Sequence, residues 1–156
     1  MQTSVCCVLS ESPDWLKEIQ AAYTKKIKPF GPFEIKEIKP KKHGRDQADF
    51  KKSAESQMLL DQIKDQDFVV LLDENGKDLN SIEFSKKMER WQNTGKKRLV
   101  FLIGGAYGVS DELKARAQES VRLSSLTMNH WMAQAVLLEQ IYRAYAIQKG
   151  LPYHNS

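Results

Sequence analysis

FVVLL at residues 68–72 and LVFLI at residues 99–103 are two uninterrupted apolar runs in the 156-residue sequence. A strand with one face in water alternates apolar and polar residues, whereas a strand of a parallel sheet is covered on both faces and stays apolar throughout. Between the two runs, a helical pattern that begins at Ser81 carries apolar residues on one face. These three segments predict a βαβ unit, so the expected fold class is α/β.

The apolar patterns elsewhere extend this prediction to most of the chain. Residues 4–9 predict a first strand, and Ser12 before Pro13 has the form of a capping serine before a proline at the first helical position. Further elements are expected at residues 33–38 (strand), 50–63 (helix) and 120–123 (strand). The apolar stripe that marks the helix consists of Phe50, Ala54, Met58 and Ile63. Because no repeat or linker divides the chain, residues 1–156 are expected to form a single domain.

The composition is typical of a soluble globular protein, with 41% hydrophobic and 28% charged residues. No apolar run is long enough to span a bilayer, and the first residues lack the pattern of a signal peptide, which predicts a cytoplasmic protein without a membrane partner. Cys6 and Cys7 are neighbours in a predicted strand and therefore point to opposite faces. They cannot grip one metal ion together, and we expect no metal site and at least one buried thiol.

The net charge of +4 is mild, and it suits a polyanionic partner without requiring one. Cations are concentrated in the segment 36–52, around Gly44. This basic segment is either a solvated surface loop or a contact for RNA, and its composition does not decide between the two.

Three turn-rich loops follow the predicted strands. They are DENGK at 73–77, GGAYG at 104–108 and SSLTMNH at 124–130. Ligands bind at the carboxyl ends of parallel strands, so we expect the loops to converge on one pocket. The loop 104–108 matches neither a dinucleotide fingerprint nor a Walker loop, and the acids at 111–112 disfavour phosphate at the next helix. It is either a cofactor loop for a phosphate-poor ligand or simply a tight strand-to-helix turn.

The last helix is expected from about residue 131 to 148 and is nearly all apolar between 135 and 147. A helix packed on one side carries a narrower apolar stripe. Either a homodimer interface or a central, fully covered position in the fold explains this breadth. His130, just before this helix, is a candidate base, and the tail 152–154 (Pro-Tyr-His) is either docked or able to reach a substrate.

With these motifs in order, the chain resembles the ribosomal RNA large subunit methyltransferase H family of the SPOUT superfamily. The resemblance covers essentially the whole length and is carried by LDENGK (72–77), LIGGAYG (102–108), residues 123–130, LEQIYRA (138–144) and PYH (152–154). It implies a parallel-sheet SPOUT fold whose C-terminal segment forms a trefoil knot, a rare exception to the rule against knots.

The resemblance also implies the activity, the partners and the site. The enzyme would be a homodimer that methylates N3 of a pseudouridine in helix 69 of 23S ribosomal RNA, within the assembled ribosome. The cofactor would be S-adenosylmethionine, held by Leu72, Gly105, Ser124, Ser125, Leu126, Thr127, Met128 and Asn129. Candidates for helping to remove the N3 proton are His130, Tyr153 and His154, with His130 and the tail from one subunit or from two.

Some positions depart from the family pattern. Asn129 stands where proline is common, Gln134 where arginine is usual, and Asn155 where a basic residue often ends the chain. Residues 9–12 also lack the glycine-lysine pair that often follows the first strand. Two alternatives therefore stay open: a SPOUT methyltransferase with another RNA target, and a non-catalytic ribosome- or RNA-binding protein of the same fold.

Overall fold

The computed structural model describes residues 1–40, 48–105 and 107–155. Residues 41–47, the centre of the basic segment 36–52, lie outside the described residues. The elements are β1 (Gln2–Val8), α1 (Asp14–Ile27), the short 3-10 helix η1 (Lys28–Phe30), β2 (Phe33–Ile38), α2 (Ala48–Leu60), β3 (Asp67–Asp78), α3 (Ser81–Gln92), β4 (Arg98–Ile103), α4 (Asp111–Arg116), β5 (Glu119–Arg122) and α5 (His130–Gln148).

The strands in the described part of the chain form one parallel sheet in the order β2-β1-β4-β3-β5. The two apolar runs lie side by side as β3 and β4, with Phe68 opposite Leu99 and Leu72 opposite Ile103. The predicted α/β class and the βαβ unit are confirmed. In this order β4, β3 and β5 are neighbours. Because they are parallel, their carboxyl ends lie next to one another at the same edge of the sheet.

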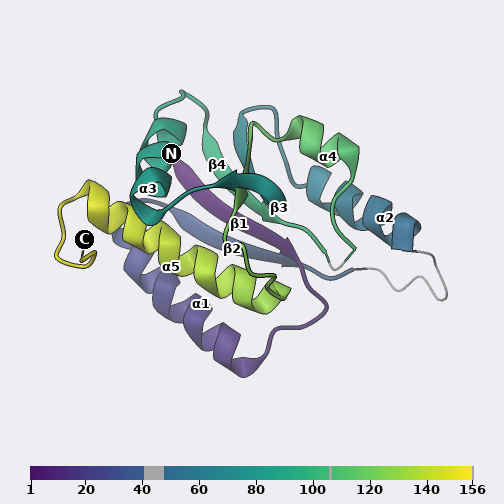
Figure 1. Cartoon of the computed structure of the whole chain (residues 1–156), viewed down its shortest axis with the longest axis horizontal. Coiled ribbons are helices and arrows are strands. Elements are labelled where there is room, and N and C mark those ends of the chain that lie inside the picture. The colour runs from purple at the N-terminus through teal and green to yellow at the C-terminus, as the bar shows by residue number, and fades with distance from the viewer. Residues whose placement is uncertain (41–47, 106, 156) are drawn as a thin grey trace.

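Helices cover both faces of the sheet (Figure 1). One core cluster joins α1, α3 and α5 to the sheet face that carries Cys7 and Phe101. The other joins α2 and α4 to the face that carries Cys6 and Leu102. Both cysteines are free and buried, on opposite faces as the alternation of a strand requires.

Two sequence predictions about helix termini and faces are wrong. Ser12 does not cap α1, because Pro13 is the N-cap residue without a side-chain cap, and the Ser12 hydroxyl instead donates to Glu37. Phe50 was expected on the buried stripe of α2 but is 52% exposed. The buried residues of α2 are Glu55, Ser56 and Leu59, so a partly polar face of this helix packs on the sheet side. Periodicity alone did not distinguish the two faces, since apolar residues occur on both.

The segment 73–77, predicted as a loop after the strand, belongs to β3. Val121 of β5 pairs with Leu72 and again with Lys77, so β3 is irregular between these two residues and then resumes its pairing. A Cβ atom at Gly76 would lie 2.6 Å from the Val121 amide nitrogen. Glycine is therefore needed where the irregular segment passes close to β5.

The breadth of the apolar surface on α5 has an explanation within one chain. Figure 1 shows α5 lying across the sheet between α1 and α3, and Leu137, Leu138, Ile141 and Ala144 are buried in the core. The central-helix alternative therefore accounts for these buried positions. The outer face still carries partly exposed apolar side chains, among them Met132 at 44%.

Candidate functional site

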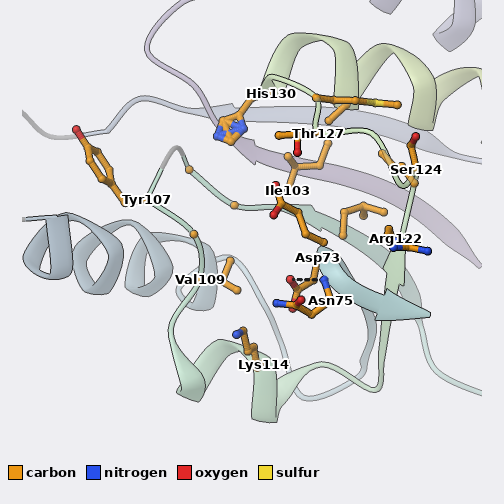
Figure 2. Close-up of a pocket in the computed structure, with 18 of the residues that line it drawn as sticks. Asp73, Asn75, Ile103, Tyr107, Val109, Lys114, Arg122, Ser124, Thr127 and His130 are labelled. Atoms are coloured by element: carbon orange, nitrogen blue, oxygen red, sulfur yellow. Dashed lines mark hydrogen bonds between the residues drawn. The ribbon is translucent and has the colours of Figure 1, made fainter. Parts of the chain in front are cut away.

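A cavity of about 430 Å³ lies where β4, β3 and β5 end. It is lined by Leu72 and Asp73 of β3, by Ile103 and the glycine loop after β4, and by residues after β5 (Figure 2). The structure thus brings the three sequence-predicted loops together. A cavity of this size fits a small organic ligand.

The glycine loop forms one wall of this cavity and leaves no space for side chains at its first two positions. A Cβ atom on Gly104 would lie 2.5 Å from Val109 Cγ1, and one on Gly105 would overlap the Glu55 carboxylate. Gly108 has a φ of +87°, a left-handed conformation that favours glycine. Glycine at 104 and 105 therefore lets the loop pack closely against Val109 and Glu55.

The segment after β5 forms the opposite wall. Ser124, Leu126, Thr127 and Met128 line the cavity, whereas Ser125 and Asn129 do not. The Asn129 side chain instead caps α5 by accepting from the Met132 amide at 2.9 Å. Asparagine at this position, where proline is common in the family, supplies a side-chain cap to the helix.

Charged groups of both signs line the cavity. Asp73 accepts a hydrogen bond from the Asn75 amide at 3.2 Å, as the dashed line in Figure 2 shows. Lys52 of α2, Lys114 of α4 and Arg122 of β5 also line it. Lys52 belongs to the basic segment 36–52. Sequence reasoning did not single out Lys114 and Arg122, because one lies inside a helix and the other inside a strand, where a charged residue is usually a solvated surface group. Their place at one edge follows from strand order.

His130 stands at the start of α5 and lines the cavity; in Figure 2 it lies between Tyr107 and Thr127. Its Nε2 atom is buried and makes no hydrogen bond to the described residues. Burial lowers the pKa of the imidazole below its ordinary value. The side chain is therefore neutral near pH 7 and able to accept a proton.

The tail residues Tyr153 and His154 lie away from this cavity. The Tyr153 hydroxyl donates to Glu139 at 3.0 Å, and Arg143 lies 4.7 Å from the Tyr153 ring centre and contacts His154 Nδ1 at 3.0 Å. Burial, with hydrogen bonds to Glu139 and Tyr23, raises the pKa of Tyr153 well above its ordinary range. Tyr153 thus stays protonated and acts as a donor.

Distance separates the tail from His130 in one chain. His130 is the first residue of α5, and the tail follows the last residue of this helix. Figure 1 shows the C-terminus at the end of α5 that is far from the junction with β5. A helix rises about 1.5 Å per residue, so the 19-residue α5 separates them by about 27 Å. The structure of one chain does not bring the tail together with the other predicted site residues.

Comparisons with known proteins identify the fold around this cavity. A family model described as "Predicted SPOUT methyltransferase" matches residues 1–154. The chain belongs to the SPOUT methyltransferase family. A relative from Bdellovibrio bacteriovorus, named ribosomal RNA large subunit methyltransferase H, is 52% identical over 141 residues, 90% of each chain. Relatives of the same name from Neisseria meningitidis and Christiangramia forsetii are 39% and 36% identical over 156 residues, 99% of each chain.

The family suggested by the motifs is thereby confirmed, and so is the expectation of an enzyme that transfers a methyl group from a donor. In this SPOUT methyltransferase Gln134, where the resemblance led us to expect arginine, is fully buried and donates to Cys7 Sγ at 3.0 Å. Its carbonyl oxygen accepts from Gln20 at 2.5 Å. Gln134 is therefore part of a neutral polar contact between α1, α5 and β1, and it does not line the cavity.

In the described residues of this SPOUT methyltransferase, no three His, Cys, Asp or Glu side chains come together as a metal site would require. None of the helices in the described part of the chain is long and apolar enough to cross a membrane.

Proposed function

We propose that the chain methylates N3 of a pseudouridine in helix 69 of 23S ribosomal RNA, using S-adenosylmethionine as donor. The observation that carries this proposal is the cavity at the ends of β4, β3 and β5 of a SPOUT methyltransferase. Relatives of the chain are named ribosomal RNA large subunit methyltransferase H, which supports a ribosomal RNA substrate. Ribosomes are the substrate, so we place the enzyme in the cytoplasm. Residues 1–156 act as one SPOUT methyltransferase domain.

The residues present fit the proposed cofactor. The glycine loop forms one wall of the cavity, which Gly104, Gly105 and Gly108 line. Leu72 and Ile103 supply apolar surface, and Ser124 and Thr127 supply hydroxyl groups. Ser125 and Asn129 belong to the same segment, and the Asn129 cap fixes the start of α5 beside the cavity. When bound, the cofactor supplies a methyl group activated by a sulfonium.

The chemistry left to this chain is positioning and proton removal. Uncharged imidazole is the form that accepts a proton, and the lowered pKa keeps His130 in that form at neutral pH. The N3 position of a pseudouridine carries a proton that must leave as the N–C bond forms. We assign its acceptance to His130, whose buried Nε2 has no partner among the described residues.

Tyr153 and His154 complete the site from a second subunit. An antiparallel contact between the α5 helices of two copies would bring the tail of one chain to His130 of the other. Partly exposed apolar side chains at this side of the molecule support such a contact, including Trp15 at 40% and Met132 at 44%. The Tyr153 hydroxyl, whose single proton is donated to Glu139, would then accept a hydrogen bond from the RNA base, and His154 would lie beside it.

We also propose that the C-terminal segment forms the trefoil knot of SPOUT proteins. Membership in the family supports this, together with the double pairing of Val121, which holds the irregular segment of β3 against β5. An experimental chain trace that follows an unknotted path would contradict it.

Ribosomal RNA from a deletion strain tests the target. Mass spectrometry of helix 69 should find the pseudouridine without its methyl group, and the cloned wild-type gene should restore it. An unchanged helix 69 with a loss of methylation elsewhere would assign another RNA target. Calorimetry with S-adenosylmethionine is the companion measurement, since a folded protein that does not bind it would exclude the cofactor.

Mixed dimers test the shared site. His130→Ala and Tyr153→Phe are each expected to lower methyl transfer strongly. In a mixed dimer of the two variants, one site carries both changes and the other carries neither. Equimolar mixing with subunit exchange should therefore restore about a quarter of wild-type activity, because half of the dimers are mixed and each has one intact site. No recovery, with mixed dimers demonstrated by mass spectrometry, would place the tail outside the site.

A further inference from the structure

Tyr107 is an exposed aromatic residue at the mouth of the cavity. It is 42% exposed and lines the cavity, and Figure 2 shows its ring pointing outward beyond His130. The rings of Phe84, Trp91 and Phe101, by contrast, pack against one another in the core. A ring at the mouth of a cavity provides a surface on which a nucleobase can stack.

The turn that carries Tyr107 is held by α2. The Gly108 amide donates to the Gly105 carbonyl at 3.1 Å. Glu55, which is only 9% exposed, packs against the first residue of the turn, and Ser56 Oγ accepts from the Ser110 amide at 2.8 Å. These contacts hold the backbone at Gly105 and Ser110, on either side of Tyr107, against α2.

One lysine lies against this ring, and two more line the same cavity. Lys51 Nζ lies 5.1 Å from the centre of the Tyr107 ring and 3.4 Å from its hydroxyl oxygen. Lys52, the next residue of α2, lines the cavity, and Lys114 lines it from α4. An aromatic ring beside cations is the combination that binds unpaired RNA, since the ring stacks on a base while the cations bind phosphates.

We propose that Lys51, Lys52 and Tyr107, here called the Tyr107 rim, form the contact for unpaired RNA at the mouth of the cavity. Tyr107 stacks on a base at or next to the methylated one, and the two lysines bind the flanking phosphates. The inference rests on the proposed function, because it describes how the same site holds its RNA. It also gives a role to one end of the basic segment 36–52.

Binding of wild type and variants to ribosomes purified from the deletion strain tests the rim. Tyr107→Ala should weaken binding about tenfold, because removal of a stacking ring has an effect of that order. Tyr107→Phe keeps the ring and should bind within about twofold of wild type. Lys51→Ala should weaken binding a few-fold and reduce the slope of log affinity against log salt by about one. The KM for S-adenosylmethionine should not change in Lys51→Ala. In Tyr107→Ala it should change by a smaller factor than the ribosome affinity, since Tyr107 also lines the cavity.

Matched controls lie on α3, on the other face of the sheet. Ile82→Ala removes an apolar side chain that is 37% exposed, and Lys86→Ala removes one exposed cation. Both should leave ribosome binding and its salt dependence unchanged. Thermal unfolding of every variant shows whether a loss of binding comes from a loss of fold.

Wild-type affinity in Tyr107→Ala would overturn the inference. The inference would also be overturned if Tyr107→Ala lost affinity for S-adenosylmethionine and for ribosomes by the same factor. The ring would then belong to the cofactor pocket. If wild type binds ribosomes without methylating them, the proposed function fails, while the comparison of Tyr107→Ala with Tyr107→Phe still decides the role of the rim.

Discussion

Replacing Gly105 by alanine tests how tightly α2 and the glycine loop are packed. Gly105 is buried and does not have a positive φ, so alanine brings no backbone strain. Its methyl group would overlap the Glu55 carboxylate, which is only 9% exposed and cannot swing freely into solvent. The change is therefore an overpacking of one methyl group.

Overpacking by a methyl group costs about 1–3 kcal/mol. For a chain of this size, each kcal/mol lowers Tm by about 2–4 °C. Gly105→Ala should accordingly lower Tm by about 2–12 °C. In a Glu55→Ala background the overlapping carboxylate is absent, so the same change should cost less than about 0.5 kcal/mol.

The assay is urea unfolding of the four proteins of this double-mutant cycle at one fixed protein concentration, since a dimer would make stability depend on concentration. Gly104→Ala serves as the matched control, because its methyl group would meet Val109 instead of Glu55. Its cost should be the same in both backgrounds. Equal costs of Gly105→Ala with and without Glu55 would refute the packing described here.

Three further predictions concern titratable groups. Because burial lowers the pKa of His130, kcat/KM for methyl transfer should rise with pH through an apparent pKa below about 6.5 and be level at neutrality. A rise in kcat/KM centred above that value would exclude His130 as the base. So would the same rise in the His130→Gln variant. Burial alone would raise the pKa of Asp67, but hydrogen bonds from Arg98, one of 2.7 Å, hold it below its ordinary value. The contribution of Asp67 to the free energy of unfolding is present above about pH 4 and is lost as pH falls through the lower pKa of the folded state. In Asp67→Asn the free energy of unfolding should therefore decrease less as pH falls below about 4. The same decrease in the variant and the wild type would contradict this. Burial raises the pKa of Cys6 to about 11 and that of Cys7 further, so a thiol reagent at neutral pH should modify both only after unfolding, whereas fast labelling of the native protein would show that one is accessible.

Much of the fold could be predicted from local pattern. The runs at 68–72 and 99–103 predict adjacent parallel strands, because only strands covered on both faces stay apolar throughout, and they pair as β3 and β4. The rule that ligands bind at the carboxyl ends of such strands also identified the three loops around the cavity. The family motifs supplied the class of enzyme.

Tertiary structure decided what depends on contacts between distant segments. Glu55 and Ser56 support the glycine loop only because the strand order places α2 beside it, and no local pattern records that order. Lys52, Lys114 and Arg122 reach the cavity for the same reason.

The segments after Leu72, Ile103 and Leu123 that meet at the cavity were thus predictable from the sequence, since burial and turn chemistry are local properties. The place of the tail was not, because the length of α5 carries Tyr153 and His154 far from His130 in one chain. Local pattern determines which segments become strands, helices and turns. Packing of those elements against one another determines which side chains meet, and that depends on pairs of residues far apart in the sequence.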